Sequence, residues 1–286
     1  MRIAQIGAAG HERLAVMVDD TNAVYVDDIV KTLSRETLWN GALADLSSAD
    51  LSTRPKVDVG GQRFGSPLER PTKVICVGLN YRKHAEESGA PVPDEPVLFM
   101  KSPDTIQGPN DDIFIPPHST ATDYEVELAI VIGKPALYLP DAQAAQSVIA
   151  GYAISQDVSE RHWQLERGGQ WDKGKSFPTF NPFGPYLVTP DEFDPTDQRL
   201  WCSVNAELRQ DSRTVDMIFG PAEIVRYISN VMELNPGDVI NTGTPHGVGF
   251  GFRPPKYLAA GDRVETGIDG LGAQSASVRA TPTNIR

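Results

Sequence analysis

Hydrophobic and polar positions alternate along much of the chain and predict many short strands. After residue 70, strand patterns occur in KVICVGL, PVLFMK, DIFIP, DYEVELAIVIG, YAISQDV, VINTGT, DRVETGI and QSASVRA. Helical periodicity is confined to short stretches such as RKHAEES, DAQAAQSVIA, ERHWQLE and a segment that opens at Pro221. Because strands outnumber helices and hairpin spacings dominate, we predict an α+β fold with a mixed, mostly antiparallel sheet.

The first part of the chain has a different character from the rest. Residues 1–60 contain short alternating segments and one helical stretch near SRETLWNGAL, without clustered chemistry. The run GGQRFGSPLERP, near residues 60–71, is rich in Gly and Pro, which mark turns and loops. We therefore expect a small β-rich N-terminal domain over residues 1–68 and a larger domain over residues 69–286.

Composition and charge exclude several classes of protein. Of the 286 residues, 40% are hydrophobic and 22% are charged, as in folded chains with a sizeable core. The formal net charge of −12 would repel nucleic acid and anionic lipid. Cys76 and Cys202 lie far apart, which predicts buried thiols rather than a disulfide or a zinc site. No signal segment or membrane-spanning apolar run is recognisable, so a cytoplasmic location is expected.

Three carboxylates are candidates for a metal site. Glu125 and Glu127 alternate in a predicted strand, so their side chains project from one face about 7 Å apart. Apolar or small residues continue that face, whereas a solvated polar face is the alternative interpretation. Asp157 ends the next strand and could supply a third oxygen. Ligands that are all oxygen suit Mg²⁺, Mn²⁺ or Ca²⁺.

A histidine followed by a carboxylate three residues later is a second candidate. His84 and Glu87 fall in the first turns of a helix that follows a buried strand. Residues three apart share a helix face, so the carboxylate can orient the imidazole. A general base that activates water needs that arrangement. A structural or solvent-facing histidine is the alternative.

Two polar segments that contain glycine complete the candidate chemistry. ERGGQWDKGKS could bring Lys175 and backbone N–H groups to an anion, although a charged surface loop is the commoner use of such a run. Arg161 and Gln164 follow Asp157 at helical spacing. NTGTPHGVG, which includes Thr244, leads from a strand into a loop with three glycines. It is either a close approach of the backbone to a ligand or a plain turn.

Together these motifs resemble the fumarylacetoacetate hydrolase superfamily. GLNYRKHAEE, DYEVELAIVIGK, the run from Asp157, KGKSFPTF, GPYLV and INTGTPHGVG occur in this order over roughly residues 70–280. The resemblance implies a mixed β-sheet roll with a barrel-like centre, a variable N-terminal domain, homodimers, and one Mg²⁺, Mn²⁺ or Ca²⁺ per subunit. Within the family, GPNDD, ERGGQWDKGKS and MIFG are most like hydrolases of 2,4-diketo-3-deoxy sugar acids from fuconate or rhamnonate breakdown.

The resemblance also implies a role for each candidate residue. The implied metal ligands are Glu125, Glu127 and Asp157. The implied pair that activates water is His84 with Glu87. The implied substrate and oxyanion contacts are Arg161, Gln164, Lys175, Tyr81 and Thr244, of which Thr244 receives the substrate carboxylate. The segment from Ser88 to Met100 corresponds to a mobile lid.

The activity that the resemblance implies is metal-dependent hydrolysis of a C–C bond. A 2,4-dioxo acid such as an acylpyruvate would be attacked at C4 by water activated at His84, releasing pyruvate or a related 2-oxo acid. Oxaloacetate decarboxylation or tautomerisation, and 2-hydroxymuconate-type isomerisation or hydration, are the alternatives among enzymes. A non-catalytic module that binds a metal or metabolite is the alternative of another class. The expected partner is a small 2-oxo acid, with neither nucleic acid nor membrane involved.

Overall fold

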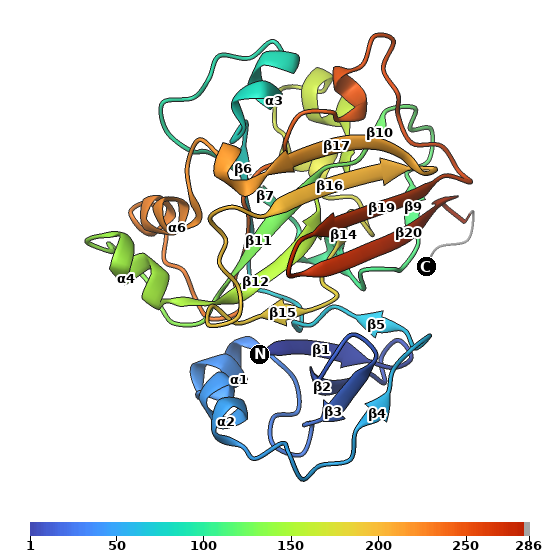
Figure 1. Cartoon of the computed structure of the whole chain (residues 1–286). Coiled ribbons are helices and arrows are strands. Elements are labelled where there is room, and N and C mark those ends of the chain that lie inside the picture. The colour runs from blue at the N-terminus through green and yellow to red at the C-terminus, as the bar shows by residue number, and fades with distance from the viewer. Residues whose placement is uncertain (283–286) are drawn as a thin grey trace.

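Two sheets organise the computed structural model, which describes residues 1–282 (Figure 1). The larger sheet has 11 strands, in the order β4 (Val57–Asp58), β3 (Asn22–Tyr25), β2 (Arg13–Met17), β1 (Arg2–Ile6), β15 (Leu187–Val188), β12 (Ile149–Gln156), β11 (Val126–Ile132), β18 (Val239–Asn241), β6 (Val74–Gly78) and β7 (Val97–Lys101), with β5 (Phe64–Gly65) beside β1. The smaller sheet has 5 strands, in the order β17 (Glu207–Arg213), β16 (Arg199–Val204), β19 (Arg263–Ile268), β20 (Gly272–Ala280) and β9 (Ile113–Ile115).

Antiparallel pairing dominates both sheets. Two further strand pairs lie outside them, β10 (Thr122–Asp123) with β13 (Ser159–Glu160), and β14 (Asn181–Pro182) with β8 (Ile106–Gln107). Parallel pairs are confined to β18 with β6, β20 with β9, and β14 with β8. The predicted fold class is therefore confirmed. The strand order of each sheet is open at both ends, so the described residues form no closed barrel.

The helices are short, and some of them begin where the sequence supplies a capping residue or a proline. They are α1 (Arg35–Trp39), α2 (Ala42–Ser48), α3 (Arg82–Glu87), α4 (Ala142–Ser147), α5 (Asp172–Lys175), α6 (Pro221–Ser229), the π-helix η2 (His162–Glu166), and the 3₁₀ turns η1 (Pro103–Thr105), η3 (Thr214–Asp216) and η4 (Gly249–Gly251). The Asp141 side chain accepts from the Ala144 N–H at the start of α4, and Pro221 opens α6. Every helix between residues 1 and 282 is too short or too polar to cross a lipid bilayer.

The central strand β11 is buried along its whole length. Val126 and Leu128 on one face belong to the core that also includes residues of the smaller sheet, such as Leu200. Ala129 and Val131 on the other face pack in a second core. Because both faces meet apolar layers, this strand lacks the solvated face of a surface sheet.

The N-terminal segment continues the larger sheet. β1 pairs with β2 on one edge and with β15 and β5 on the other. Figure 1 shows residues of this segment, in blue, as a smaller lobe below the rest of the molecule. Ile3 and Leu14 share a buried cluster with Val74 and Ala129 from the other part of the chain. The domain boundary between residues 68 and 69 stays a prediction.

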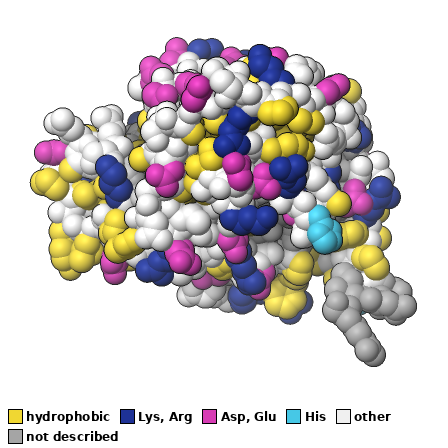
Figure 2. Space-filling model, turned by 90° about the horizontal axis from the view of Figure 1, so that it is seen from below, with side chains coloured by type: hydrophobic (Ala, Val, Ile, Leu, Met, Phe, Trp, Pro, Cys, Tyr) yellow, Lys and Arg dark blue, Asp and Glu magenta, His cyan; other side chains and the backbone are white. Residues whose placement is uncertain are grey.

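Acidic and basic side chains are interspersed on the face drawn in Figure 2, without a broad basic area.

Part of the segment expected to be a lid is instead a sheet strand. Val97–Lys101 form β7, which is antiparallel to β6 from the Val74–Lys101 pair to the Gly78–Val97 pair. Strand hydrogen bonds fix this part of the segment. A lid could therefore include only residues 88–96, which follow α3 without regular structure.

Candidate active site

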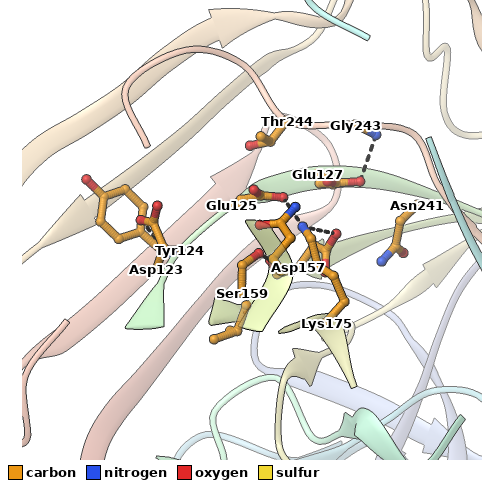
Figure 3. Close-up of polar contacts among 12 residues, drawn as sticks. Asp123, Tyr124, Glu125, Glu127, Asp157, Ser159, Lys175, Asn241, Gly243 and Thr244 are labelled. Carbon is orange, nitrogen blue, oxygen red and sulfur yellow. Dashed lines mark hydrogen bonds and ion pairs between the residues drawn. The ribbon is translucent and has the colours of Figure 1, made fainter. Parts of the chain in front are cut away.

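β11 and β12 bring three carboxylates together (Figure 3). The strands are antiparallel, and the Asp157 N–H donates to the Glu125 carbonyl oxygen at 2.8 Å. Glu125 and Glu127, at the start of one strand, therefore lie beside Asp157 at the end of the other. All three side chains are buried, and one carboxylate oxygen of each lies within 4.8 Å of the others. Their burial excludes the alternative of a solvated polar face.

Two buried lysines hold Asp157 by different oxygens. Lys175 Nζ donates to Asp157 Oδ2 at 2.8 Å and to Glu125 Oε2 at 2.7 Å (Figure 3). Lys101 Nζ donates to Asp157 Oδ1 at 2.5 Å and to the Val158 carbonyl oxygen at 3.1 Å. Sequence reasoning missed Lys101, whose only signal is a charge at the end of the apolar run PVLFM. A lysine with no exposed side chain needs such partners.

Glu127 is held by the glycine-containing loop after β18. The Gly243 N–H donates to Glu127 Oε2 at 2.7 Å (Figure 3). Gly243 has φ +99°, and a Cβ there would lie 2.7 Å from the Asn80 Cβ and 2.9 Å from the Val77 carbonyl oxygen. Only glycine fits this position. The loop therefore makes a close backbone approach, here to a site carboxylate.

Arg161 links the carboxylates to a further acidic residue. Its Nε lies 2.8 Å from Asp123 Oδ2, and its Nη1 lies 2.7 Å from Glu125 Oε1 and 3.0 Å from Gln164 Oε1. Asp123 also accepts from the Gly249 N–H at 2.7 Å. Sequence reasoning missed Asp123, although it stands two residues before Glu125. Arg161 Nη2 is buried and has no hydrogen-bond partner within residues 1–282, which leaves a donor for a ligand.

The predicted histidine–carboxylate pair is formed. His84 Nδ1 lies 2.8 Å from Glu87 Oε1 on α3. The Gly247 N–H donates to both oxygens of Glu87, at 3.1 and 2.9 Å. The loop that holds Glu127 thus also fixes the carboxylate that orients the imidazole. His84 is buried and lines a cavity, which excludes a solvent-facing histidine.

Two of the expected substrate-binding residues, Thr244 and Tyr81, are less available to a ligand than the others. The Thr244 hydroxyl donates to the Val126 carbonyl oxygen at 2.9 Å and accepts from Gln210 Nε2 at 2.8 Å. Its hydrogen is therefore committed to the backbone. Tyr81 is buried, its hydroxyl has no hydrogen-bond partner within residues 1–282, and it is outside the residues that line the cavity.

The charges in the cluster are unequally compensated. Burial raises the pKa of Glu125, but the Lys175 ammonium and the Arg161 guanidinium outweigh burial and hold it at about 2. Burial, followed by the neighbouring Asp157 and Glu125 carboxylates, raises the pKa of Glu127 well above its usual value. Glu127 is thus the carboxylate whose negative charge the surrounding cations compensate least.

A cavity of about 150 Å³ opens beside these groups. Seven of the sequence-predicted residues line it, namely His84, Glu125, Glu127, Arg161, Gln164, Lys175 and Thr244. The rest of the wall, called here the acyl wall, consists of Val77, Gly78, Leu79, Ser88, Ala90, Phe99, Leu165, Trp171 and Phe250. A histidine and two of the three clustered carboxylates therefore face one small space.

The donor set fits a divalent cation. Three carboxylates within 4.8 Å of one another are hard oxygen ligands of the kind that Mg²⁺, Mn²⁺ and Ca²⁺ prefer. The uncompensated charge at Glu127 is of the sign that a cation would neutralise. The described residues therefore agree with the metal site expected from the sequence.

Known proteins with similar sequences cover nearly the whole chain. Residues 73–279 match the family model described as fumarylacetoacetate (FAA) hydrolase C-terminal. A relative from Burkholderia multivorans is 47% identical over 282 residues, covering 98% of this chain and 99% of that protein. Its name proposes a hydrolase without naming a substrate.

Solved structures share the fold at lower identity. A fumarylacetoacetate hydrolase from Exiguobacterium antarcticum is 37% identical, with a TM-score of 0.88 over 98% of this chain and 100% of that one. A 2-hydroxyhepta-2,4-diene-1,7-dioate isomerase from Mycobacterium marinum is 32% identical, with a TM-score of 0.79 over 99% and 100%. A maleylpyruvate hydrolase from Sphingobium, in complex with manganese(II) and pyruvate, is 26% identical, with a TM-score of 0.80 over 99% and 100%.

Proposed function

The chain belongs to the fumarylacetoacetate hydrolase family, and on that premise we propose that it is a divalent-metal-dependent hydrolase that cleaves a C–C bond of a 2,4-dioxo acid. The products would be a carboxylic acid and pyruvate or a related 2-oxo acid. One observation carries the proposal. His84, which contacts Glu87, lines the same cavity as Glu125 and Glu127, and Asp157 completes the carboxylate cluster within 4.8 Å of these two.

The cation would be held by Glu125, Glu127 and Asp157. Mg²⁺ or Mn²⁺ suits this oxygen-only set, and the manganese(II) bound by the maleylpyruvate hydrolase from Sphingobium supports the assignment. When bound, a divalent cation polarises the carboxylate and 2-oxo oxygens of such a substrate. Arg161 Nη2, the buried donor without a partner, would bind the same end of the substrate.

His84 would act as the general base. If Nδ1 carries the proton and donates to Glu87, Nε2 is left as the acceptor for a proton from water. The hydroxide so formed adds to the C4 carbonyl. Arg161 donates to Gln164 Oε1, so the Gln164 amide NH₂ remains free to donate to the C4 oxyanion. Cleavage of the C3–C4 bond then releases the acyl group as a carboxylic acid, and the pyruvate enolate would take at C3 the proton that His84 accepted from water.

A second candidate is isomerisation of a 2-hydroxydienoate. The likeness to the isomerase from Mycobacterium marinum favours it. Isomerisation moves a proton without adding water, so His84 would then serve as a proton carrier. Oxaloacetate decarboxylation is a further alternative, because oxaloacetate has the same 2-oxo acid end as a 2,4-dioxo acid. A module without catalysis has no use for the His84–Glu87 pair, which opposes that alternative.

An assay for pyruvate release tests the proposed hydrolase activity and separates it from oxaloacetate decarboxylation. The substrates are acetylpyruvate, 2,4-diketo-3-deoxy sugar acids, fumarylpyruvate and oxaloacetate, each with and without Mg²⁺. We expect metal-dependent pyruvate release from at least one 2,4-dioxo acid, faster than from oxaloacetate. Release from oxaloacetate alone, or from none, would contradict the proposal. The predicted homodimer and cytoplasmic location stay predictions.

A further inference from the structure

We infer that the enzyme prefers 2,4-dioxo acids with a short, uncharged acyl group over those that carry a second carboxylate. The inference rests on the proposed function and names its substrate class. The 2-oxo acid end would be held at the carboxylate cluster and Arg161, and C4 must lie within reach of His84. The acyl group on C4 therefore has the acyl wall to contact.

The acyl wall is apolar and well supported. Apart from Ser88 and the backbone of Gly78, it consists of aliphatic and aromatic side chains. Phe99 and Trp171 meet edge to face, with ring centroids 5.4 Å apart. A Cβ at residue 78 would come within 2.4 Å of the Trp171 ring, so the indole lies directly against the glycine backbone. This packing fixes both rings in place.

The cations that line the cavity already have partners. Lys175 contacts Glu125 and Asp157, and Arg161 contacts Asp123 and Glu125. The remaining donor of Arg161, Nη2, is needed for the first carboxylate of the substrate.

The basic residues nearest in sequence to His84 offer no substitute. Arg82 and Lys83 on α3 are exposed and do not line the cavity. A second carboxylate would therefore leave water for an apolar wall without a counter-charge, which is unfavourable. A single hydroxyl on the acyl group is less unfavourable than a carboxylate, because it can form a hydrogen bond with Ser88.

The cavity size points to a short acyl group. Its volume of about 150 Å³ matches that of a cavity that accepts one benzene ring. The 2-oxo acid end occupies part of this space. Little remains beyond C4, so a methyl-ended acyl group fits better than an extended unsaturated acid.

Steady-state pyruvate release from acetylpyruvate and fumarylpyruvate by the Mg²⁺-loaded protein tests the preference. We expect kcat/KM to be higher for acetylpyruvate by at least about 10²-fold, since an apolar pocket discriminates by about that ratio even against an added neutral hydroxyl. Equal values, or a higher value for fumarylpyruvate, would overturn the inference.

A charge introduced on the acyl wall provides a second test. Ala90 is half-buried beyond the end of α3, so a longer side chain there can reach the cavity without disturbing the core. Ala90→Arg should raise the fumarylpyruvate-to-acetylpyruvate ratio of kcat/KM by about two- to fivefold over Ala90→Gln, the matched uncharged variant, as expected for a partly exposed ion pair. Equal ratios in the two variants would contradict the inference that fumarylpyruvate is disfavoured because the acyl wall lacks a counter-charge.

Binding measurements separate this inference from the proposed function. If neither these two compounds nor the 2,4-diketo-3-deoxy sugar acids are cleaved, the proposed hydrolase activity fails. Calorimetric titration of both compounds into the Mg²⁺-loaded protein then decides the preference. Tighter binding of acetylpyruvate supports it. Tighter or equal binding of fumarylpyruvate, or binding of neither compound, overturns it.

Discussion

Glu87 connects α3 to a loop 160 residues away in the chain, because it contacts His84 and accepts from the Gly247 N–H. The imidazole is therefore oriented by a carboxylate that is itself fixed. This arrangement resists rotation of His84 and favours one tautomer. Because the imidazole is fixed in this way, substitution of His84 alone tests its role.

We predict that His84→Ala lowers kcat for pyruvate release from a 2,4-dioxo acid by about 10²–10⁴, the usual range for a lost general base. Metal binding should persist. Oxaloacetate decarboxylation, which needs no activated water, should fall much less. Glu87→Gln should have a smaller effect, and the double variant should lose little beyond His84→Ala. Equal losses of both activities would indicate a structural role for His84.

The raised pKa of Glu127 leads to a prediction of how metal affinity depends on pH. Burial and the neighbouring Asp157 and Glu125 carboxylates raise its pKa, so the metal-free protein keeps a proton on Glu127 to a higher pH than a free carboxyl does. A cation must displace that proton. The affinity for Mg²⁺ or Mn²⁺ should therefore fall as the pH falls through the raised pKa. Above that pKa the affinity should reach its maximum and no longer depend on the protonation of Glu127.

Calorimetry in buffers of different ionisation enthalpy measures the proton released. Glu127→Gln should weaken metal binding and abolish this release while the protein stays folded, whereas the exposed control Glu166→Gln should change neither. Affinity that is independent of pH, without proton release, would show that Glu127 is no ligand.

At the scale of elements, three strands of the larger sheet place the clustered carboxylates and one of their lysine partners. β11 and β12 supply the carboxylates, and β7 ends at Lys101, whose ammonium contacts Asp157 Oδ1. Lys175 occupies the other oxygen of Asp157 from α5. Lys101 lies within the sheet and is not among the residues that line the cavity, so we expect it to position Asp157.

We predict that Lys101→Met lowers metal affinity by about 10–100-fold, as expected when a ligand loses its orienting partner. It should also lower the free energy of unfolding by about 3–5 kcal/mol, because the Asp157 carboxylate loses a buried counter-charge. Lys73→Met, which removes an ion pair with Asp238 away from the cavity, is the matched control and should keep metal affinity. Calorimetry and urea unfolding measure the two effects, and unchanged affinity in Lys101→Met would exclude positioning.

Local patterns in the sequence were sufficient to predict most of these elements and the residues they bring together. Alternation located β11, and spacing placed Glu125 and Glu127 on one face. Lys101 and Asp123 escaped prediction because their partners come from other strands, and pairing register is a tertiary property. The helix expected over ERHWQLE is the π-helix η2, which directs Gln164 inward and leaves Leu165 exposed. Helical periodicity does not distinguish these two forms.

At the scale of the whole molecule, the N-terminal segment and the remainder share one sheet and one core. The turn-rich run near residues 60–71 predicted a boundary, and Figure 1 shows a distinct lobe. Yet β1 pairs with β15, and Ile3 packs in the same cluster as Val74. Sequence patterns locate a linker, but they carry no information on which edge of a sheet a preceding strand will join.

We therefore predict that the chain unfolds in urea as one cooperative unit despite its two lobes. Loss of residues 1–68 would uncover the edge of β15 and the apolar side chains beneath it, including Leu187, so neither part should be stable while the other is unfolded. Circular dichroism and tryptophan fluorescence should give coincident transitions, because Trp39 reports on the N-terminal lobe and the three other tryptophans lie beyond residue 160. A chelator should be present, since bound metal would stabilise one lobe selectively. Two separated transitions would show instead that residues 1–68 form an independent domain, and that the strand pairing between the lobes contributes little to stability.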